Sequence, residues 1–189
     1  MLKMYYTLPN GLSFAHVSRS CTSTLCAHAL KNFFPEQYQL WKQENLHSPQ
    51  RYLEEHWSNR LPPRCLVIVR NPIDRLMSLL SRNHYDKDIV LSCLKVCYRE
   101  GVIAREYSRS LSICRFHHIA PVTNIAENDS IFVLFPEIDK ACRLLDMSFD
   151  DTIHENSLPL DAIKEKLDPE FIPLLQDSVG LWEALCKHQ

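Results

Sequence analysis

The feature that most constrains the fold is a short, uniformly apolar segment near the middle of the chain. Cys65-Leu-Val-Ile-Val69 is mostly β-branched, follows two prolines and an arginine, and is itself followed by Arg70. A run of this length and composition is typical of a strand buried on both faces, as in a parallel sheet covered by helices. The sequence therefore predicts an α/β protein with helices packed on a central sheet.

A helix is predicted directly after this strand. Asn71 is a favourable N-cap residue, Pro72 suits the first helical position, and Asp74 complements the helix dipole in the first turn. Three apolar residues recur at helical spacing and define a core face: Ile73, Leu76 and Leu80. Arg70 then stands at the carboxyl end of the strand, the edge at which open α/β sheets bind ligands.

A second strand–loop–helix unit is predicted near the N-terminus. Asn10-Gly11 between two apolar stretches indicates a β-hairpin formed by residues 3–8 and 12–17. The chain then enters a hydroxyl-rich segment, residues 18–24, in which Arg19 is the single cation. A helix is expected from about Ser23 to Phe34, where Pro35 stops it.

Two interpretations of residues 18–24 are open on these grounds. The segment can be a turn that caps the helix, because Ser and Thr are preferred N-cap residues. It can equally be an anion site, because unpaired N–H groups and the positive end of the dipole favour phosphate. The hydroxyls at positions 20, 22, 23 and 24 and the guanidinium of Arg19 would then add donors.

The other elements complete one domain over residues 1–189. One or two helices are expected between residues 36 and 60, interrupted near Ser48-Pro49, and a third buried strand is expected at residues 131–135. Residues 138–147 form an amphipathic helix with three residues on its apolar side: Ala141, Leu144 and Leu145. Helices are also expected over residues 88–98, 102–111, 160–167 and 171–186, with a loop over residues 148–159.

Charge and hydropathy limit the partners and the location. The net charge is −2 at pH 7 and the pI is about 6.5, so no general attraction to nucleic acid or to an anionic membrane is expected. No apolar run approaches the roughly 20 residues of a spanning helix, and the N-terminus has no apolar leader segment. The sequence therefore predicts a cytoplasmic protein.

The cysteines favour reduced thiols. Of the eight cysteines, several lie in apolar segments, as Cys65 does, and no secretory signal is visible. Cys93 and Cys97 are four residues apart but have no matching Cys/His pair, so no metal site is predicted.

The unit around Arg70 resembles a known nucleotide-binding motif. Ile68-Val-Arg-Asn-Pro-Ile-Asp-Arg-Leu-Met-Ser78 is similar to the 3′-phosphate-binding motif of sulfotransferases, and most of all to that of the carbohydrate sulfotransferase type. The resemblance implies that Arg70 and Ser78 bind the 3′-phosphate of 3′-phosphoadenosine-5′-phosphosulfate (PAPS). Arg75 also matches the motif, either as a ligand-binding residue or as a structural one on the helix.

The hydroxyl-rich segment resembles the 5′-phosphosulfate loop of the same family. Arg19 matches its basic position and Ser23-Thr24 its hydroxyl pair, and Ser20, Cys21 and Thr22 complete the loop between them. The resemblance implies a P-loop type of nucleotide-binding fold, a three-layer sandwich with a mainly parallel central sheet. It also implies metal-independent transfer of a sulfuryl group from PAPS to a hydroxyl of a carbohydrate or small-molecule acceptor. Weaker similarities lie at residues 129–135, 155–157 and 174–182.

Family members usually place the catalytic base between the two phosphate motifs. His47, before Pro49, is the first candidate and His56 the second, since a histidine titrates near neutral pH. The same window holds four glutamates: Glu36, Glu44, Glu54 and Glu55. It also holds four aromatic residues that can form an acceptor platform or belong to the core: Tyr38, Trp41, Tyr52 and Trp57. His117 and His118 are either acceptor-site residues or an ordinary loop pair.

Two other interpretations stay open. The loop over residues 18–24 contains no glycine, and Cys21 and Thr22 occupy positions where glycine is common in the family. The chain can therefore be a sulfotransferase-like binding or interaction protein without turnover. A P-loop kinase is the other alternative, although the Gly-x-x-x-x-Gly-Lys-Ser/Thr motif is absent.

Overall fold

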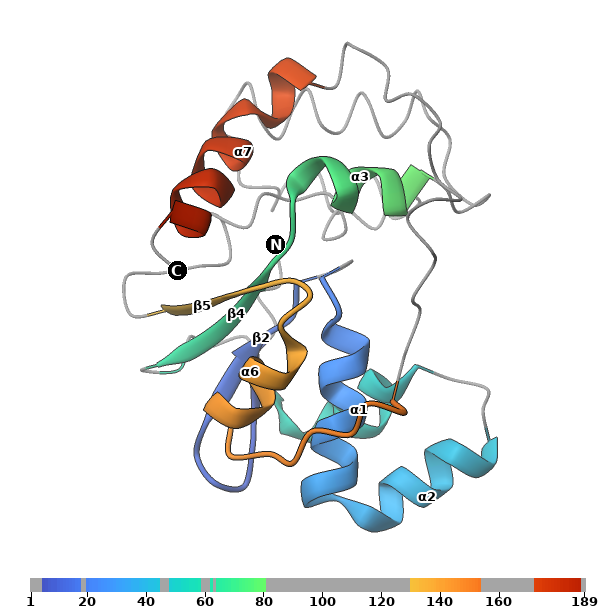
Figure 1. Ribbon diagram of the computed structural model, residues 1–189. Helices are drawn as coiled ribbons and strands as arrows, with labels where there is room; N and C mark the ends of the chain where they lie inside the picture. The colour runs from blue at the N-terminus through green and yellow to red at the C-terminus, as the bar shows by residue number, and fades with distance from the viewer. Residues whose placement is uncertain are drawn as a thin grey trace.

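One five-stranded sheet organises the protein (Figure 1). The computed structural model describes residues 5–17, 20–44, 48–58, 62, 64–80, 130–153 and 172–187. The strands are β1 (Tyr5–Thr7), β2 (Ser13–Ala15), β3 (Trp57–Ser58), β4 (Cys65–Val69) and β5 (Ser130–Leu134). The helices are α1 (Thr22–Phe33), α2 (Pro35–Glu44), the 3₁₀ helix η1 (Pro49–His56), α3 (Pro72–Leu80), α6 (Ile138–Leu144) and α7 (Ile172–Lys187).

The sheet is mixed, in the order β3-β1-β2-β4-β5. Strands β2, β4 and β5 run parallel, whereas β1 pairs antiparallel with both β2 and β3. The prediction of an α/β protein is confirmed. The prediction of a mainly parallel sheet is not met in the described residues, because the N-terminal hairpin and β3 extend the parallel part with antiparallel strands.

Strand β4 is buried on both faces, as its composition predicts. Leu66 and Ile68 pack in a core cluster with residues of α1 and α6. The alternate residues of the strand pack in a second cluster against α7: Cys65, Val67 and Val69. Helices therefore cover both faces of the sheet, with α1 and α6 on one side and α7 on the other (Figure 1).

The predicted N-terminal hairpin is confirmed, with Tyr6 opposite Phe14. Gly11 takes the positive φ of the turn, +82°. The side chain of Asn10 accepts a hydrogen bond from Leu12 N at 3.1 Å and donates one to Leu145 O at 2.9 Å. Asn10 therefore fastens the turn to the end of α6.

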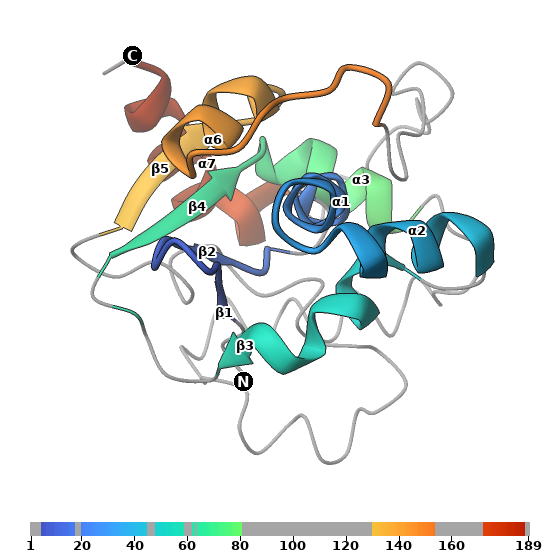
Figure 2. The same cartoon turned by 90° about the horizontal axis from the view of Figure 1, so that it is seen from below.

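The helices after β2 begin and end near the positions that the prolines predict. α1 ends at Phe33, Pro35 begins α2, and η1 begins at Pro49 after the predicted interruption. Figure 2 shows α2 and η1 beside α1, and both pack against it. Strand β3 was not predicted, because two residues are too short for an alternating pattern.

Two expectations about the second half of the chain are corrected. Leu144 is 42% exposed, because α6 turns Ile138, Ala141 and Cys142 to the core instead. Strand β5 lies at an end of the described sheet, and only Val133 in it is fully buried. The helix expected over residues 171–186 is confirmed as α7. The elements expected over residues 88–98, 102–111 and 160–167 lie outside the described residues.

Among the helices of the described ranges, none has both the length and the apolar character required to cross a bilayer. Five cysteines lie in these ranges and all are free thiols: Cys21, Cys26, Cys65, Cys142 and Cys186.

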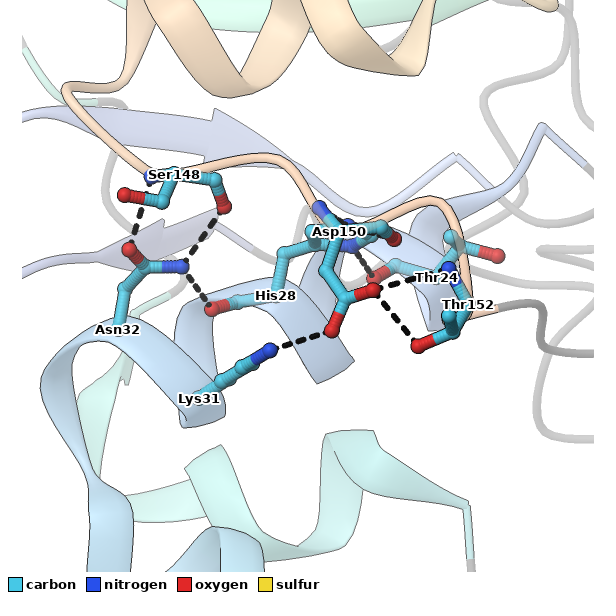
Figure 3. A network of polar contacts seen from close by, with 7 residues as sticks. All are labelled: Thr24, His28, Lys31, Asn32, Ser148, Asp150 and Thr152. Atoms are coloured by element: carbon cyan, nitrogen blue, oxygen red, sulfur yellow. Dashed lines mark hydrogen bonds and ion pairs between the residues drawn. The ribbon is translucent and has the colours of Figure 1, made fainter.

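The segment after α6 docks on α1 through a polar network (Figure 3). Asn32 accepts a hydrogen bond from Ser148 N at 2.8 Å and donates to Ser148 O at 3.0 Å and to His28 O at 2.9 Å. Its amide thus satisfies both backbone groups of Ser148, much as a neighbouring strand would.

The fully buried ring of His28 forms the centre of this network. Its Nδ1 lies 2.9 Å from Thr24 O, and its Nε2 accepts from Asp150 N at 3.2 Å, with the ring of Phe149 stacked at 5.3 Å. Asp150 pairs with Lys31 and accepts a hydrogen bond from Thr152 Oγ1 at 2.6 Å. The network joins the segment to the same helix that begins at the hydroxyl-rich loop.

Replacing Asn32 by Ala should destabilise the protein by about 1 kcal/mol, because two hydrogen bonds to Ser148 are lost while helix propensity improves slightly. Urea unfolding measures the change. Gln37→Ala, at an exposed position of α2, is the matched control. An equal effect of both variants would contradict the role given to Asn32.

The pKa of Asp150 is held well below its usual range, chiefly by Lys31 and then by Thr152. A carboxylate whose pKa is lowered in the folded state stabilises that state at pH values above its unfolded pKa of about 4. This contribution is lost as the pH falls. The stability difference between the wild type and Asp150→Asn should therefore be largest near neutral pH and shrink below about pH 4. Urea unfolding from pH 3 to 7 tests this, and a difference independent of pH would contradict it.

Candidate functional site

The two sequence motifs meet at one edge of the sheet. β2 and β4 are neighbouring parallel strands, with Phe14 beside Leu66. Since both run the same way, the loop that leaves β2 towards α1 and the turn that leaves β4 at Arg70 follow the same ends of the strands. This is the edge at which open α/β sheets bind ligands.

The charge of Arg70 acts on the loop at the start of α1. Burial raises the pKa of the Cys21 thiol, while the guanidinium of Arg70 and a hydrogen bond with the Thr24 side chain act in the opposite direction. The same interaction acts on Arg70. The pKa of its guanidinium is lowered by burial and raised by Asp74 and Cys21. The loop at the start of α1 therefore lies within range of the Arg70 charge.

Arg70 is held in a fixed, largely buried position. Its side chain is 8% exposed, and its guanidinium carbon lies 4.8 Å from the centre of the Phe135 ring. Phe135 is placed by a 2.7 Å hydrogen bond from its N–H to Val69 O. A guanidinium stacked on an aromatic ring keeps its charge and its planar set of donors, which suits the recognition of an oxyanion.

Helix α3 begins as the sequence predicts. Asn71 Oδ1 accepts from Ile73 N at 2.9 Å and from Asp74 N at 3.4 Å, which is N-cap geometry. Ser78 lies one turn beyond Asp74 on the same helix face, and Asp74 is near Arg70. Ser78 is 8% exposed and Arg75 is 5% exposed, so both side chains are buried.

The loop before α1 has a left-handed residue at its turn. Cys21 has φ 57° and ψ 21°, a conformation that glycine adopts without steric cost. Thr22 closes the loop: its hydroxyl donates to Val17 O at 2.7 Å and accepts from Val17 N at 3.1 Å. The Thr22 proton is therefore used inside the protein.

The other hydroxyls of the loop differ in their contacts. Ser20 is completely buried, and no group in the described part of the chain forms a hydrogen bond with its Oγ. Ser23 is partly exposed and accepts a 2.7 Å hydrogen bond from Gln50 Nε2. Thr24 is 6% exposed and interacts with Cys21. Among the described hydroxyls of the loop, those of Ser20 and Ser23 thus have protons available for a ligand.

Of the two histidine candidates for the base, His56 lies in the described part of the chain, and it is not brought to this loop. His47 and Arg19 lie outside the described residues, as do His117 and His118. His56 packs on Phe34, with ring centres 4.2 Å apart, just beyond the far end of α1. The twelve residues of α1 span about 17 Å, so His56 lies roughly that far from the loop.

The remaining candidates of this window have ordinary surroundings. Trp41 is 4% exposed and belongs to the core, whereas Trp57 on β3 is 46% exposed. Tyr38 and Tyr52 pack partly on the same core. The carboxylate of Glu44 accepts a hydrogen bond from Tyr52. All four glutamates of the window are exposed: Glu36, Glu44, Glu54 and Glu55.

Three residues of the site region escaped the sequence analysis. Phe135 was assigned to a strand, Gln50 is not titratable and matches no motif, and His28 lies in an apolar helical run. Only His28 carried a signal, because a histidine on a buried helix face needs hydrogen-bond partners.

Comparisons with protein-family models, with curated proteins and with solved structures found no match for this chain.

Replacing Thr22 by Val should destabilise the protein by about 1–3 kcal/mol, because the buried N–H and C=O of Val17 lose the hydroxyl that satisfies them. Thr22→Ser keeps the hydroxyl and should lose less. Chemical unfolding of both variants measures the difference. Equal losses would show that the hydroxyl contributes no more than the methyl group and would contradict the loop-closing role.

Proposed function

We propose that the protein is a sulfotransferase that moves a sulfuryl group from PAPS to a hydroxyl of a carbohydrate or small-molecule acceptor. The observation that carries the proposal is the parallel pairing of β2 with β4, because the loop before α1 and Arg70 then follow the same edge of the sheet. This pairing supports a common site for the two segments that resemble the 5′-phosphosulfate loop and the 3′-phosphate motif.

The residues fit the demands of a nucleotide with phosphate groups at both ends. Arg70 offers a buried, planar cation at the carboxyl end of β4, and Ser78 lies on the adjoining helix. Ser23 and the N–H groups in the first turn of α1, which have no acceptor within the helix, offer donors for the 5′-phosphosulfate. Arg19, the basic residue of the loop motif, would neutralise the phosphate that leaves.

In the reaction, the acceptor oxygen forms a bond to sulfur as the bond between sulfur and the 5′-phosphate oxygen breaks. The acceptor proton passes to a base, for which His47 remains the first candidate of the sequence motif. The donors of the loop would stabilise the charge that builds up on the departing phosphate.

A second candidate function is a binding protein of the same fold type without turnover. Two observations favour it: Cys21 occupies a left-handed position suited to glycine, and the Thr22 proton is used by Val17. The backbone of this loop can therefore approach a ligand less closely than that of a glycine-containing loop, and the Thr22 hydroxyl is no longer a free donor.

The decisive experiment compares 3′-phosphoadenosine-5′-phosphate (PAP) with ATP plus Mg²⁺ as ligands, by calorimetry and thermal shift. PAP at about 100 times its Kd should add about 2.7 kcal/mol to the free energy of unfolding. Arg70→Ala should weaken PAP binding at least about tenfold, since a desolvated charge contact is lost. Arg143→Ala, at an exposed arginine paired only with Asp139, is the matched control.

A preference for ATP with Mg²⁺, or no binding of PAP, would overturn the proposal. Arg70→Lys, which keeps the charge but not the planar fork, serves if Arg70→Ala does not fold. Transfer of labelled sulfate from PAPS to a panel of hydroxyl acceptors then separates the enzyme from the binding protein. PAP binding without transfer would favour the second candidate.

A further inference from the structure

A side-chain contact outside both motifs controls one hydroxyl of the candidate loop. Gln50 Nε2 donates a hydrogen bond to Ser23 Oγ at 2.7 Å. Gln50 lies in the first turn of η1, between the buried residues Pro49 and Leu53, and η1 packs along α1. The amide is therefore presented to Ser23 by a backbone that the core holds in place.

The direction of this hydrogen bond decides what Ser23 can do. Because the Ser23 oxygen accepts from Gln50, its own proton stays available, and no second partner within the described residues takes it. Ser23 is the second residue of α1, where backbone N–H groups also lack intrahelical partners. The hydroxyl and these N–H groups together favour an acceptor that carries negative charge.

A buried hydroxyl in the loop also points to a ligand. Ser20 Oγ is buried without a hydrogen-bond partner in the described part of the chain. Ser20 is 0% exposed and stands in the loop that leads to Ser23. A buried hydroxyl normally has a partner, so this orphaned donor indicates a site that a ligand with acceptor oxygens completes.

We propose that Gln50 is a positioning residue, which holds the Ser23 hydroxyl so that its proton is donated to an oxyanion bound at the start of α1. The inference rests on the proposed function in that the oxyanion is taken to be the 5′-phosphate or phosphosulfate group. Gln50 itself does not touch the oxyanion. By donating to the Ser23 oxygen, it leaves the Ser23 proton for the oxyanion.

A double-mutant cycle tests this role. Dissociation constants for PAP and for inorganic pyrophosphate are measured by calorimetry for the wild type, Gln50→Met, Ser23→Ala and the double variant. Gln50→Met keeps the length of the side chain and removes the amide. Each single variant should bind about fivefold more weakly, as expected for one neutral hydrogen bond. The double variant should bind no more weakly than Ser23→Ala.

Gln50→Glu provides an opposite test of direction. Its carboxylate would accept the Ser23 proton and repel an oxyanion, so binding should weaken more than tenfold. Gln37→Ala, on the exposed face of α2, is the control that should bind as the wild type does. Unfolding midpoints without ligand show whether any variant has lost its fold.

The outcomes separate this inference from the proposed function. Coupled losses for pyrophosphate without any binding of PAP would support the role of Gln50 and overturn the sulfotransferase proposal. Normal PAP binding by Gln50→Met, or additive losses in the double variant, would overturn the role of Gln50 alone. Binding of neither probe by the wild type would overturn both.

Discussion

The burial of β4 on both faces is the constraint on which the rest of the structure depends. Its five residues are at most 3% exposed, and alternate side chains enter the two core clusters. A strand in this position needs a neighbour on each edge and helices on each face. β2 and β5 supply the parallel edges, and α1, α6 and α7 supply the cover. The carboxyl end of β4 then opens at the place where the loop before α1 begins.

This arrangement brings together groups that lie far apart in the sequence. Arg70 leaves β4 within electrostatic range of Cys21, and it stacks on Phe135, which follows the adjoining end of β5. Within the loop the hydroxyls divide between two tasks. Thr22 closes the backbone on Val17, while Ser23 is held by Gln50 with its proton available. A hydroxyl-rich segment can thus be a structural turn and an anion-binding loop at once, and the two interpretations of residues 18–24 need not exclude each other.

α1 connects this loop to the opposite side of the protein. Along one face, His28 and Asn32 hold the segment from Ser148 to Thr152 (Figure 3). On another side, η1 supplies Gln50 to Ser23. The start of α1 is therefore fixed from two directions, which keeps the directions of its donors constant. Fixed donors are what distinguishes an anion site from an ordinary helix end, since no reorganisation is needed when charge arrives.

The sequence by itself determined the local elements: the hairpin at Asn10-Gly11, the buried strand Cys65–Val69, and the helix capped by Asn71. Each follows from neighbours along the chain, through turn chemistry, apolar run length or an N-cap. Only the tertiary structure decided the antiparallel pairing of β3 and the exposure of Leu144. It also decided that Arg70 stacks on Phe135 and that Gln50 donates a hydrogen bond to Ser23. It also placed His56 beside Phe34, away from the loop. These features depend on which elements pack together, and a contact between residues distant in sequence leaves no periodicity or motif in the chain.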